Sequence, residues 1–317
     1  MQNMKYNESI TPLVGVVMVS YNHENYIEQA VESVMMQQTD FAYKLFIAED
    51  KSTDNTKAIC ERLVVKYPGK IDFVSNEINL GSSKNVAVLM DRVIRSGVKY
   101  VAILDGDDYW TEPRKLQMQV DLLEKDDNAA FCYSNIIKLD VKKGEFLPFE
   151  SLNVPGGKVD MKQFVEQGAY IPTLTLCFKV SCFPQSMPAF FSNIIKQDWF
   201  ICLVLVKNGY GVFLDAITGA YRIHQGGIMH TRKTKLYANS LYMVECAMNY
   251  LAPDYQEVFG YIVSTHALSL AFAHLENREY GSFAKYLKQA IVAGGDKNFN
   301  WYWLIVKRFI RHFVPRR

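Results

Sequence analysis

The feature that most constrains the fold is a regular alternation of apolar runs and helical patterns over the first 140 residues. Five apolar runs predict strands, at residues 14–20, 43–50, 71–75, 100–104 and 129–139. Between them, apolar residues recur at helical spacing over 24–37, 54–67, 84–96 and 113–124. Strands that alternate with helices of this length predict a parallel sheet that helices cover on both faces.

The remainder of the chain is less regular. Beyond residue 140 the pattern predicts a short helix near 160–167, a strand near 173–180, an apolar helix at 198–206 and a strand at 212–222. From residue 232 onward only helical patterns occur, at 232–251, 254–276 and 279–293. Because ligands of parallel α/β sheets bind at the carboxyl ends of strands, we expect the chemistry in the loops after residues 20, 50 and 104.

Composition excludes several classes of protein. With 49% apolar residues the chain can bury a core, and a net charge of +2 gives no indication that it binds nucleic acid. The six cysteines form no CxxC pair, so we expect buried, reduced thiols rather than a zinc site or a disulfide framework. The N-terminus lacks an apolar signal region and no run of 18 apolar residues occurs, which predicts a cytoplasmic protein.

The strongest motif is LDGDDYW at residues 104–110, which places Asp105, Asp107 and Asp108 directly after a predicted strand. Like charges this close repel one another unless a cation neutralises them. Mg²⁺ and Mn²⁺ prefer carboxylate oxygens together with substrate phosphates, so the motif predicts a divalent cation site. A solvated acidic turn is the alternative interpretation. A calcium-binding EF-hand is disfavoured because Leu116 occupies the twelfth position, where a bidentate Glu is needed.

The loop after the first strand reads VSYNHENY, at residues 19–26. Its ring and polar groups could stack on a nucleotide base and hydrogen-bond to it; they belong to Ser20, Tyr21, Asn22 and Glu24. The alternative is that these residues only cap the helix that follows.

Two further loops carry groups that suit a nucleotide. Asp50 ends the second strand, where its carboxylate could accept a hydrogen bond from a base or a ribose hydroxyl. In NLGSSKNVA, at 79–87, Gly81 permits close backbone approach and Lys84 can meet a phosphate or a base carbonyl. The loop matches neither G-x-G-x-x-G nor the Walker A sequence, which argues against dinucleotide-binding and P-loop proteins.

Taken in order, these segments resemble the family 2 glycosyltransferases of the GT-A fold. The resemblance covers about residues 12–230 and rests on six pieces: VSYNHENYIEQAVESV, EDKSTDNT, NLGSSKNVA, LDGDDYW, QDWFICLVLVKNG and YRIHQGGIMH. It implies an α/β fold with a Rossmann-like, mostly parallel sheet flanked by helices. We therefore expect a GT-A domain at 1–230, a helical C-terminal region at 231–296 and a basic, aromatic tail at 297–317.

The resemblance also implies roles for individual residues. Tyr21, Glu24 and Asp50 would bind the base and ribose of a nucleotide sugar, with Lys84 nearby. Asp105 would contact ribose or metal. Asp107 would ligate the metal that bridges the diphosphate, and Asp108 is a weaker candidate for a metal ligand.

Two later motifs complete the implied site. Asp198 matches the acidic residue that serves as catalytic base, although Gln197 stands where many relatives have Glu. Arg222 and His224 match a late loop that closes on the diphosphate. The alternatives are that Asp198 caps its helix and that His224 is a structural histidine.

The implied function is metal-dependent, inverting transfer of a sugar from a nucleotide sugar to a hydroxyl of a glycan or lipid-linked acceptor. A UDP-sugar is the expected donor, and Mn²⁺ or Mg²⁺ the expected cofactor. Two rival functions are a nucleotidyltransferase and a non-catalytic, membrane-associated interaction protein. The first would require a Gly-rich, basic signature after strand one, which this loop lacks.

The C-terminal tail combines aromatic and basic residues. Residues 301–317 read WYWLIVKRFIRHFVPRR, a composition that suits a helix lying on an anionic membrane. Such a helix would hold the enzyme at the inner face of the plasma membrane, near a lipid-linked substrate. The alternative is a helix that packs on the body of the protein and exposes its basic face to solvent.

Overall fold

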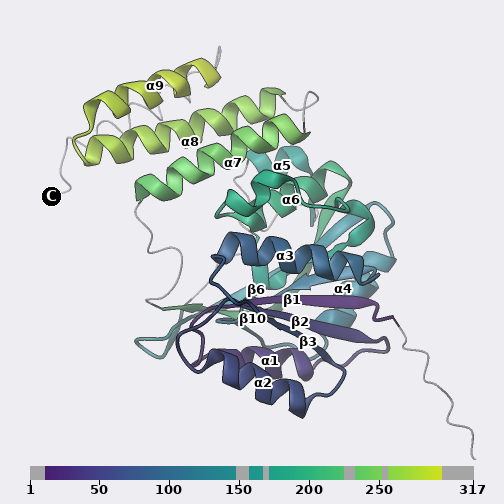
Figure 1. Cartoon of the computed structure of the whole chain (residues 1–317). Coiled ribbons are helices and arrows are strands. Elements are labelled where there is room, and N and C mark those ends of the chain that lie inside the picture. Colours follow the sequence, from purple (N-terminus) through teal and green to yellow (C-terminus); the bar gives the residue numbers. More distant parts are fainter. Residues whose placement is uncertain (1–10, 148–156, 167–170, 225–232, 252–255, 295–317) are drawn as a thin grey trace, which may run out of the picture. The chain divides into compact units, whose positions relative to one another are not determined.

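The computed structural model describes residues 11–147, 157–166, 171–224, 233–251 and 256–294 (Figure 1). Within them, ten strands form one sheet in the order β3-β2-β1-β4-β9-β6-β10-β5, with β7 paired to β6 and β8 to β10. The strands that reach the candidate site are β1 (Val14–Ser20), β2 (Tyr43–Glu49), β3 (Ile71–Ser75), β4 (Tyr100–Ile103), β6 (Ala129–Asp140) and β10 (Tyr210–Ile223). The remaining strands are short: β5 (Tyr109–Trp110), β7 (Glu145–Leu147), β8 (Lys158–Val159) and β9 (Cys177–Lys179).

The sheet is mixed but mostly parallel among its long strands, as the predicted fold class implies. Strands β3, β2, β1 and β4 are parallel to one another, as are β6 and β10. Between these two groups lies β9, which runs antiparallel to both β4 and β6. The apolar pattern of residues 173–180 predicted a strand but carries no information on its direction. The turn before it, η1 (Thr173–Thr175), is a 3-10 helix rather than part of the strand.

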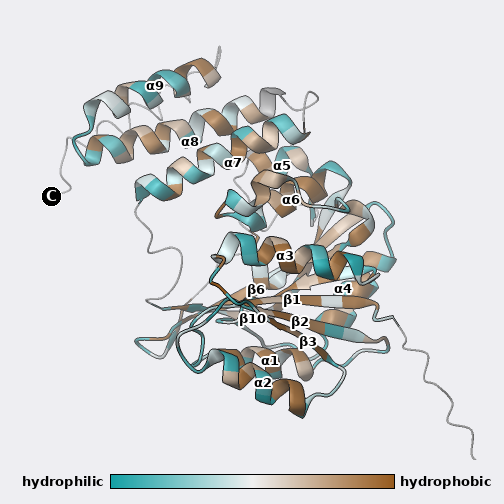
Figure 2. Ribbon diagram, in the orientation of Figure 1, coloured by the Kyte–Doolittle hydropathy of each residue, from teal (hydrophilic) through white to brown (hydrophobic). Residues whose placement is uncertain are grey.

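Helices cover both faces of the sheet. On one face, α1 (Ile27–Met35), α2 (Thr56–Lys66) and α4 (Lys115–Glu124) contribute Val31, Leu63 and Leu116 to a core that includes Val16 and Leu45. Helix α3 (Ser82–Arg95) lies on the opposite side from α1 and α2 (Figure 1). Figure 2 shows that the strands between these layers are largely hydrophobic.

Close packing of α3 requires a glycine in β1. A Cβ atom at Gly15 would lie 2.7 Å from Cγ1 of Val93 on α3, so only glycine lets the helix approach this strand. Two more helices complete this part of the chain, α5 (Met161–Glu166) and α6 (Gln197–Lys207), and α6 packs against β6 and β10. Two 3-10 turns, η2 (Val180–Cys182) and η3 (Ala189–Asn193), connect β9 to α6.

The chain divides into two compact units. The first holds the sheet, and the second comprises residues 226–317 with two short segments, 165–168 and 194–196. The domain boundary predicted at residue 230 stays a prediction, and the tail at 297–317 lies outside the described residues. Of the described cysteines, Cys60, Cys132, Cys177 and Cys202 are buried and all six are free thiols.

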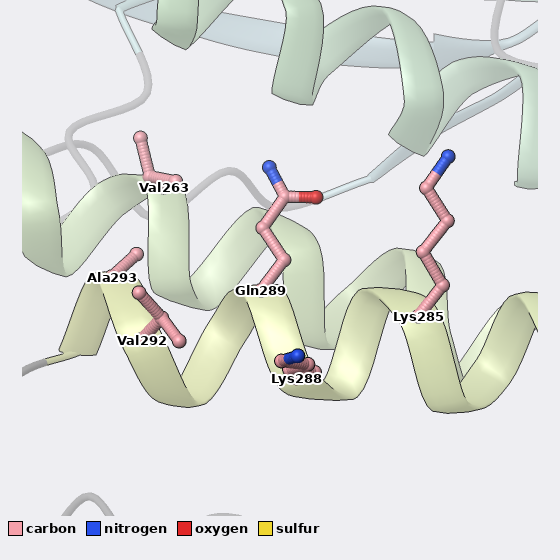
Figure 3. Close-up of a pocket in the computed structure, with 6 residues that line it drawn as sticks. All are labelled: Val263, Lys285, Lys288, Gln289, Val292 and Ala293. Atoms are coloured by element: carbon pink, nitrogen blue, oxygen red, sulfur yellow. The ribbon is translucent and has the colours of Figure 1, made fainter.

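The second unit contains α7 (Lys233–Leu251), α8 (Gln256–Glu276) and α9 (Tyr280–Gly294), of which α8 packs against both others. Ser264 Oγ of α8 donates a hydrogen bond to the Ala290 carbonyl of α9 at 2.9 Å. An open pocket between these two helices is lined by Val263, Lys285, Lys288, Gln289, Val292 and Ala293 (Figure 3). Among the described residues no helix has the length and hydropathy needed to cross a membrane.

Candidate active site

The loops after β1 and β2 are tied together by side chains that the sequence assigned to nucleotide binding. Asn22 adopts a left-handed backbone conformation (φ 56°), and its N–H donates to Ser52 Oγ at 3.0 Å. Its Oδ1 accepts from the Thr53 N–H at 2.9 Å. Glu24 Oε2 accepts from the N–H and the Nδ2 of Asn55, at 3.0 and 2.8 Å. Asn22 and Glu24 therefore order two loops, while Tyr21 remains 43% exposed and can stack on a base.

Asp50 holds the loop that follows β3. This buried carboxylate accepts from Asn76 Nδ2 and the Leu80 N–H on Oδ1, and from the Gly81 N–H on Oδ2, each at 2.8 Å. Gly81 takes a φ of +82°, which few other residues tolerate. The next residues open α3, where Lys84 is exposed on the first turn. The loop therefore places a cation beside the ends of β1 and β2.

Two buried polar residues that support these loops escaped the sequence analysis. Glu49 is fully buried and accepts from Ser75 Oγ at 2.7 Å and from the Ser52 N–H. Asn85 donates from Nδ2 to the Ala48 carbonyl at 3.0 Å and accepts from Asn76 at 2.9 Å. A Glu at the end of an apolar strand was the available signal for Glu49. Nothing in the helical pattern distinguished Asn85.

The acidic loop at 105–108 lies directly against the end of β1. The Gly106 N–H donates to the Val19 carbonyl at 3.0 Å, and the Asp108 N–H donates to the Asp105 carbonyl at 3.1 Å. A Cβ atom on Gly106 would lie 2.9 Å from His23 Nδ1 and 3.0 Å from Ser20 Oγ. Only glycine lets the acidic loop approach β1 this closely. Ser20 Oγ is buried and has no hydrogen-bond partner among the described residues.

Asp108 and Arg222 form a buried pair. Asp108 is 3% exposed, and its Oδ1 accepts from the Arg222 backbone N–H at 2.8 Å. Burial, and next the charge of Asp107, raise the pKa of Asp108 well above its ordinary value. Asp108 therefore anchors the backbone of β10, and its assignment as a weaker candidate for a metal ligand stays a prediction.

The Arg222 guanidinium is also occupied within the protein. Its Nη1 donates to the Asp107 carbonyl at 2.7 Å and its Nη2 donates to Gln29 Oε1. It lies over the rings of Tyr26 and Tyr109, at 5.2 and 4.4 Å from their centroids. Arg222 therefore holds the acidic loop in position, and contact with a diphosphate would require it to leave these partners.

Asp107 faces two imidazoles. His224 Nε2 lies 3.0 Å and His23 Nε2 lies 3.7 Å from the same atom, Asp107 Oδ2. Burial opposes ionisation, but the hydrogen bond to His224 and the nearby His23 hold the pKa of Asp107 below its ordinary value. The structure thus joins His224 to the acidic motif, whereas its predicted contact with a diphosphate stays a prediction. It adds His23, whose only signal in the sequence was its place in a loop at a strand end.

Asp198 stands in the first turn of α6, close to the acidic loop. Its Oδ2 accepts from Thr173 Oγ1 at 3.3 Å. Burial raises the pKa of Asp105 to about 7, and the charges of Asp107 and Asp198 contribute to the shift. The three carboxylates therefore lie within electrostatic reach of one another, although Asp198 follows Asp105 by 93 positions in the sequence.

The departure at Gln197 has a structural explanation. Its Nε2 donates to the carbonyls of Ser83 and Phe191, at 2.8 and 2.9 Å. A glutamate carboxylate could make neither bond, because it has no hydrogen to donate. Gln197 thus fixes the start of α6, and with it Asp198, to the first turn of α3.

The partly exposed carboxylates Asp105 and Asp107 fit a hard divalent cation. The described residues contain no group of three or more His, Cys, Asp or Glu side chains arranged to hold a metal ion. Proteins usually bind Mg²⁺ through one or two carboxylates that act together with substrate phosphates and water. The protein would supply Asp107 and Asp105, and a nucleotide diphosphate would supply further oxygens.

Comparison with known proteins identifies the family. The model of the glycosyl transferase family 2 matches residues 15–181, which include the loops after β1, β2 and β3 and the acidic motif. The chain belongs to glycosyl transferase family 2. The family and the glycosyltransferase class predicted from the sequence are thereby confirmed.

Curated relatives carry names from glycan synthesis. The dTDP-rhamnosyl transferase RfbG of Shigella flexneri is 29% identical over 222 residues, which cover 66% of this chain and 72% of RfbG. The glucosyltransferase WfgD of Escherichia coli, named as acting on α-D-GlcNAc-diphosphoundecaprenol, is 27% identical over 230 residues, or 71% of this chain and 82% of WfgD. An uncharacterized protein of Mycobacterium tuberculosis, Rv1520, is 28% identical over 224 residues, and the match spans only 62% of its length.

Solved structures confirm the predicted GT-A fold. S. aureus TarS 1–349 in complex with UDP-GlcNAc superposes with a TM-score of 0.63 at 17% identity, covering 88% of this chain and 81% of that one. The mannosyltransferase PcManGT of Pyrobaculum calidifontis, in complex with GDP-Man and Mn²⁺, gives a TM-score of 0.59 at 15% identity. That match covers 94% of this chain and 80% of PcManGT. The assignments of individual site residues stay predictions.

Proposed function

We propose that this chain is a metal-dependent, inverting glycosyltransferase that moves a sugar from a nucleotide sugar to an acceptor hydroxyl. The observation that carries the proposal is the meeting of Asp105, Asp107 and Asp198 at the carboxyl edge of the sheet. In a member of family 2, this arrangement supplies two cation ligands beside one candidate base.

Asp198 would remove the proton of the attacking hydroxyl. The Thr173 hydroxyl donates to its Oδ2 at 3.3 Å and helps to orient the carboxylate. In an inverting displacement the hydroxyl oxygen forms a bond to the anomeric carbon as the bond to the diphosphate breaks. The electron pair of the broken bond remains on the diphosphate. General-base assistance of this kind accelerates reactions by about 10²–10⁴-fold.

The opposite side of the site would receive the leaving diphosphate. Asp107 and Asp105 would hold the cation, and a bound Mn²⁺ or Mg²⁺ would stabilise the negative charge that develops on the diphosphate. His224 Nε2 lies 3.0 Å from Asp107 Oδ2, so it orients this carboxylate and places an imidazole beside the proposed cation site. Tyr21 and Lys84 would bind the base and ribose. The Asp50 carboxylate already accepts three hydrogen bonds, so its part would be to shape the pocket through the 76–81 loop.

The donor and acceptor are proposed from the relatives. The names of RfbG and WfgD point to different nucleotides, dTDP and UDP, and TarS binds UDP-GlcNAc. We propose a UDP-sugar donor because WfgD is named for UDP-Glc and TarS was solved with UDP-GlcNAc, and Tyr21 offers an exposed ring on which a base could stack. The acceptor would be a glycan or a lipid-linked saccharide, as the name of WfgD indicates for that enzyme.

A donor screen tests the proposal. Calorimetry with UDP, UDP-glucose, UDP-N-acetylglucosamine, GDP-mannose and dTDP-rhamnose, with and without Mn²⁺, should give metal-dependent binding of one nucleotide class. Asp107→Asn should lose the metal dependence, whereas Asp40→Asn, a control on the exposed loop before β2, should keep it. Metal-independent binding, or no binding of any nucleotide, would refute the proposal.

A further inference from the structure

Strand β6 carries two polar side chains, two residues apart, that the proposed transfer does not use. The hydroxyl of Tyr133 and the Oδ1 of Asn135 are shielded from solvent, and neither has a hydrogen-bond partner among the described residues. Tyr133 is 1% exposed. Leaving such a group buried and unpaired costs about 1–3 kcal/mol, so each calls for a partner that binds there.

The two groups lie on the side of the sheet that α6 covers. Residues two apart on a strand point to the same face, so Tyr133 and Asn135 share one face of β6. Helix α6 packs against β6 and β10, and its Cys202 contributes to the raised pKa of Tyr133. Asp198 stands one helical turn before Cys202 on α6.

The register of the sheet brings Asn135 level with the acidic motif. Cys177 of β9 pairs with Ala102 of β4 on one side and with Cys132 of β6 on the other. Since β4 and β6 run in the same direction, three further residues along each lead to Asp105 and Asn135. Two strand spacings, roughly 10 Å, separate Ala102 from Cys132, and Asp105 lies just beyond the end of β4.

Turn η1 lies between them and contacts both strands. Its Thr173 donates to Asp198 at 3.3 Å. Asp105, Thr173, Asp198 and Asn135 therefore occupy one region at the carboxyl edge of the sheet.

The sheet is irregular and partly exposed beside Asn135. The pairing of β10 with β6 shifts register between Leu214 and Ile217, and Ile217 is the residue that pairs with Asn135. Ile217 is 53% exposed, and Asn135 is itself partly exposed although its Oδ1 is covered. The bulge thus leaves the edge of the sheet accessible next to an unpaired hydrogen-bond acceptor.

The chemistry of these groups identifies the ligand class. The Asn135 Oδ1 and the Asp198 carboxylate only accept hydrogen bonds, whereas the Tyr133 hydroxyl can donate or accept. A group with several O–H donors on a compact ring complements them. We propose that Asn135, together with Tyr133, forms a subsite for the hydroxyls of a pyranose ring next to Asp198. The inference rests on the proposed function and deepens it, since the ring belongs either to the donor sugar or to the acceptor.

Two variants test the subsite, Asn135→Ala and Tyr133→Phe. Calorimetry compares UDP with UDP-glucose, UDP-N-acetylglucosamine and dTDP-rhamnose, and turnover is measured with water and with p-nitrophenyl glycosides as acceptors. If the ring is the donor sugar, the affinity gained on adding the sugar falls about tenfold while UDP binding is unchanged. If it is the acceptor, donor binding and donor hydrolysis are unchanged and KM for the glycoside rises about tenfold.

A stability control separates the subsite from a structural role. Because the Tyr133 hydroxyl is unpaired, Tyr133→Phe should leave the melting temperature unchanged or raise it. Tyr43→Phe should lower it, since the Tyr43 hydroxyl donates to the Val34 carbonyl at 3.0 Å. Unchanged sugar affinity and unchanged turnover in both β6 variants would overturn the inference and leave the proposed function standing. Failure of the wild type to bind any nucleotide would instead overturn the proposed function, and the subsite with it.

Discussion

Replacement of Asp50 by Asn tests how the nucleotide-side loop is held. The substitution keeps the size of the side chain and removes its charge. Asp50 accepts three hydrogen bonds at 2.8 Å, two on Oδ1 and one on Oδ2. In Asp50→Asn one oxygen becomes an NH₂ group. The N–H group that bonded to that oxygen then loses its acceptor and faces the N–H donors of the new NH₂ group.

The magnitude follows from these bonds. A hydrogen bond to a charged group contributes about 1.5–3 kcal/mol, against about 1 kcal/mol for a neutral one. Losing one such bond and weakening two should cost about 3–5 kcal/mol of unfolding free energy. That is a large fraction of the roughly 5–15 kcal/mol by which folded proteins are usually stable.

Urea unfolding measures the loss, and amide hydrogen exchange locates it. Exchange should accelerate most at Leu80 and Gly81, whose N–H groups donate to Asp50. Asp72→Asn on β3 is the matched control. Its carboxylate pairs with Arg92 at the surface and should contribute under about 1 kcal/mol. Equal effects of the two substitutions, or unchanged exchange at the 76–81 loop, would refute the reasoning.

Three further predictions address the base, a buried lysine and the tail. Asp198→Asn should keep donor binding and lower transfer about 10²–10⁴-fold, measured as single-turnover rate; full turnover would place the base elsewhere. Burial lowers the pKa of Lys115 to about 8, so the unfolded chain binds more protons above that pH. The wild type should therefore gain about 3 kcal/mol of stability over Lys115→Met between pH 8 and about pH 10.5, measured by urea unfolding, and a constant difference would contradict this. Deleting residues 298–317 should abolish sedimentation with phosphatidylglycerol vesicles, and continued sedimentation would exclude the tail as anchor.

Local patterns in the sequence located most of the elements of the site. The apolar run at 100–104 and the aspartates that follow it predicted β4 and an acidic loop, because a buried strand needs continuous apolar residues. Helix ends were less accurate. The predicted helix at 113–124 begins at Lys115 in the structure, since residues before it form a turn in which the Lys115 N–H donates to the Glu112 carbonyl.

The sequence could not reveal that neighbouring acidic residues make different contacts. Asp107 and Asp108 are neighbours, yet one faces two imidazoles and the other anchors the backbone of Arg222. That difference depends on β10, 114 residues away, and on the direction in which its side chains point. Gln197 was read as a lost carboxylate, but its role as a donor appears only once α3 and η3 lie beside α6.

By itself the sequence determined which segments form strands and helices and which loops carry carboxylates, because periodicity and local chemistry act over a few residues. Tertiary structure alone decided the antiparallel insertion of β9, the pairing of Asp108 with Arg222, and the approach of His23 and His224 to Asp107. These depend on strand order and register, which are fixed by packing between residues distant in the chain, where a shift of one position turns every side chain to the other face.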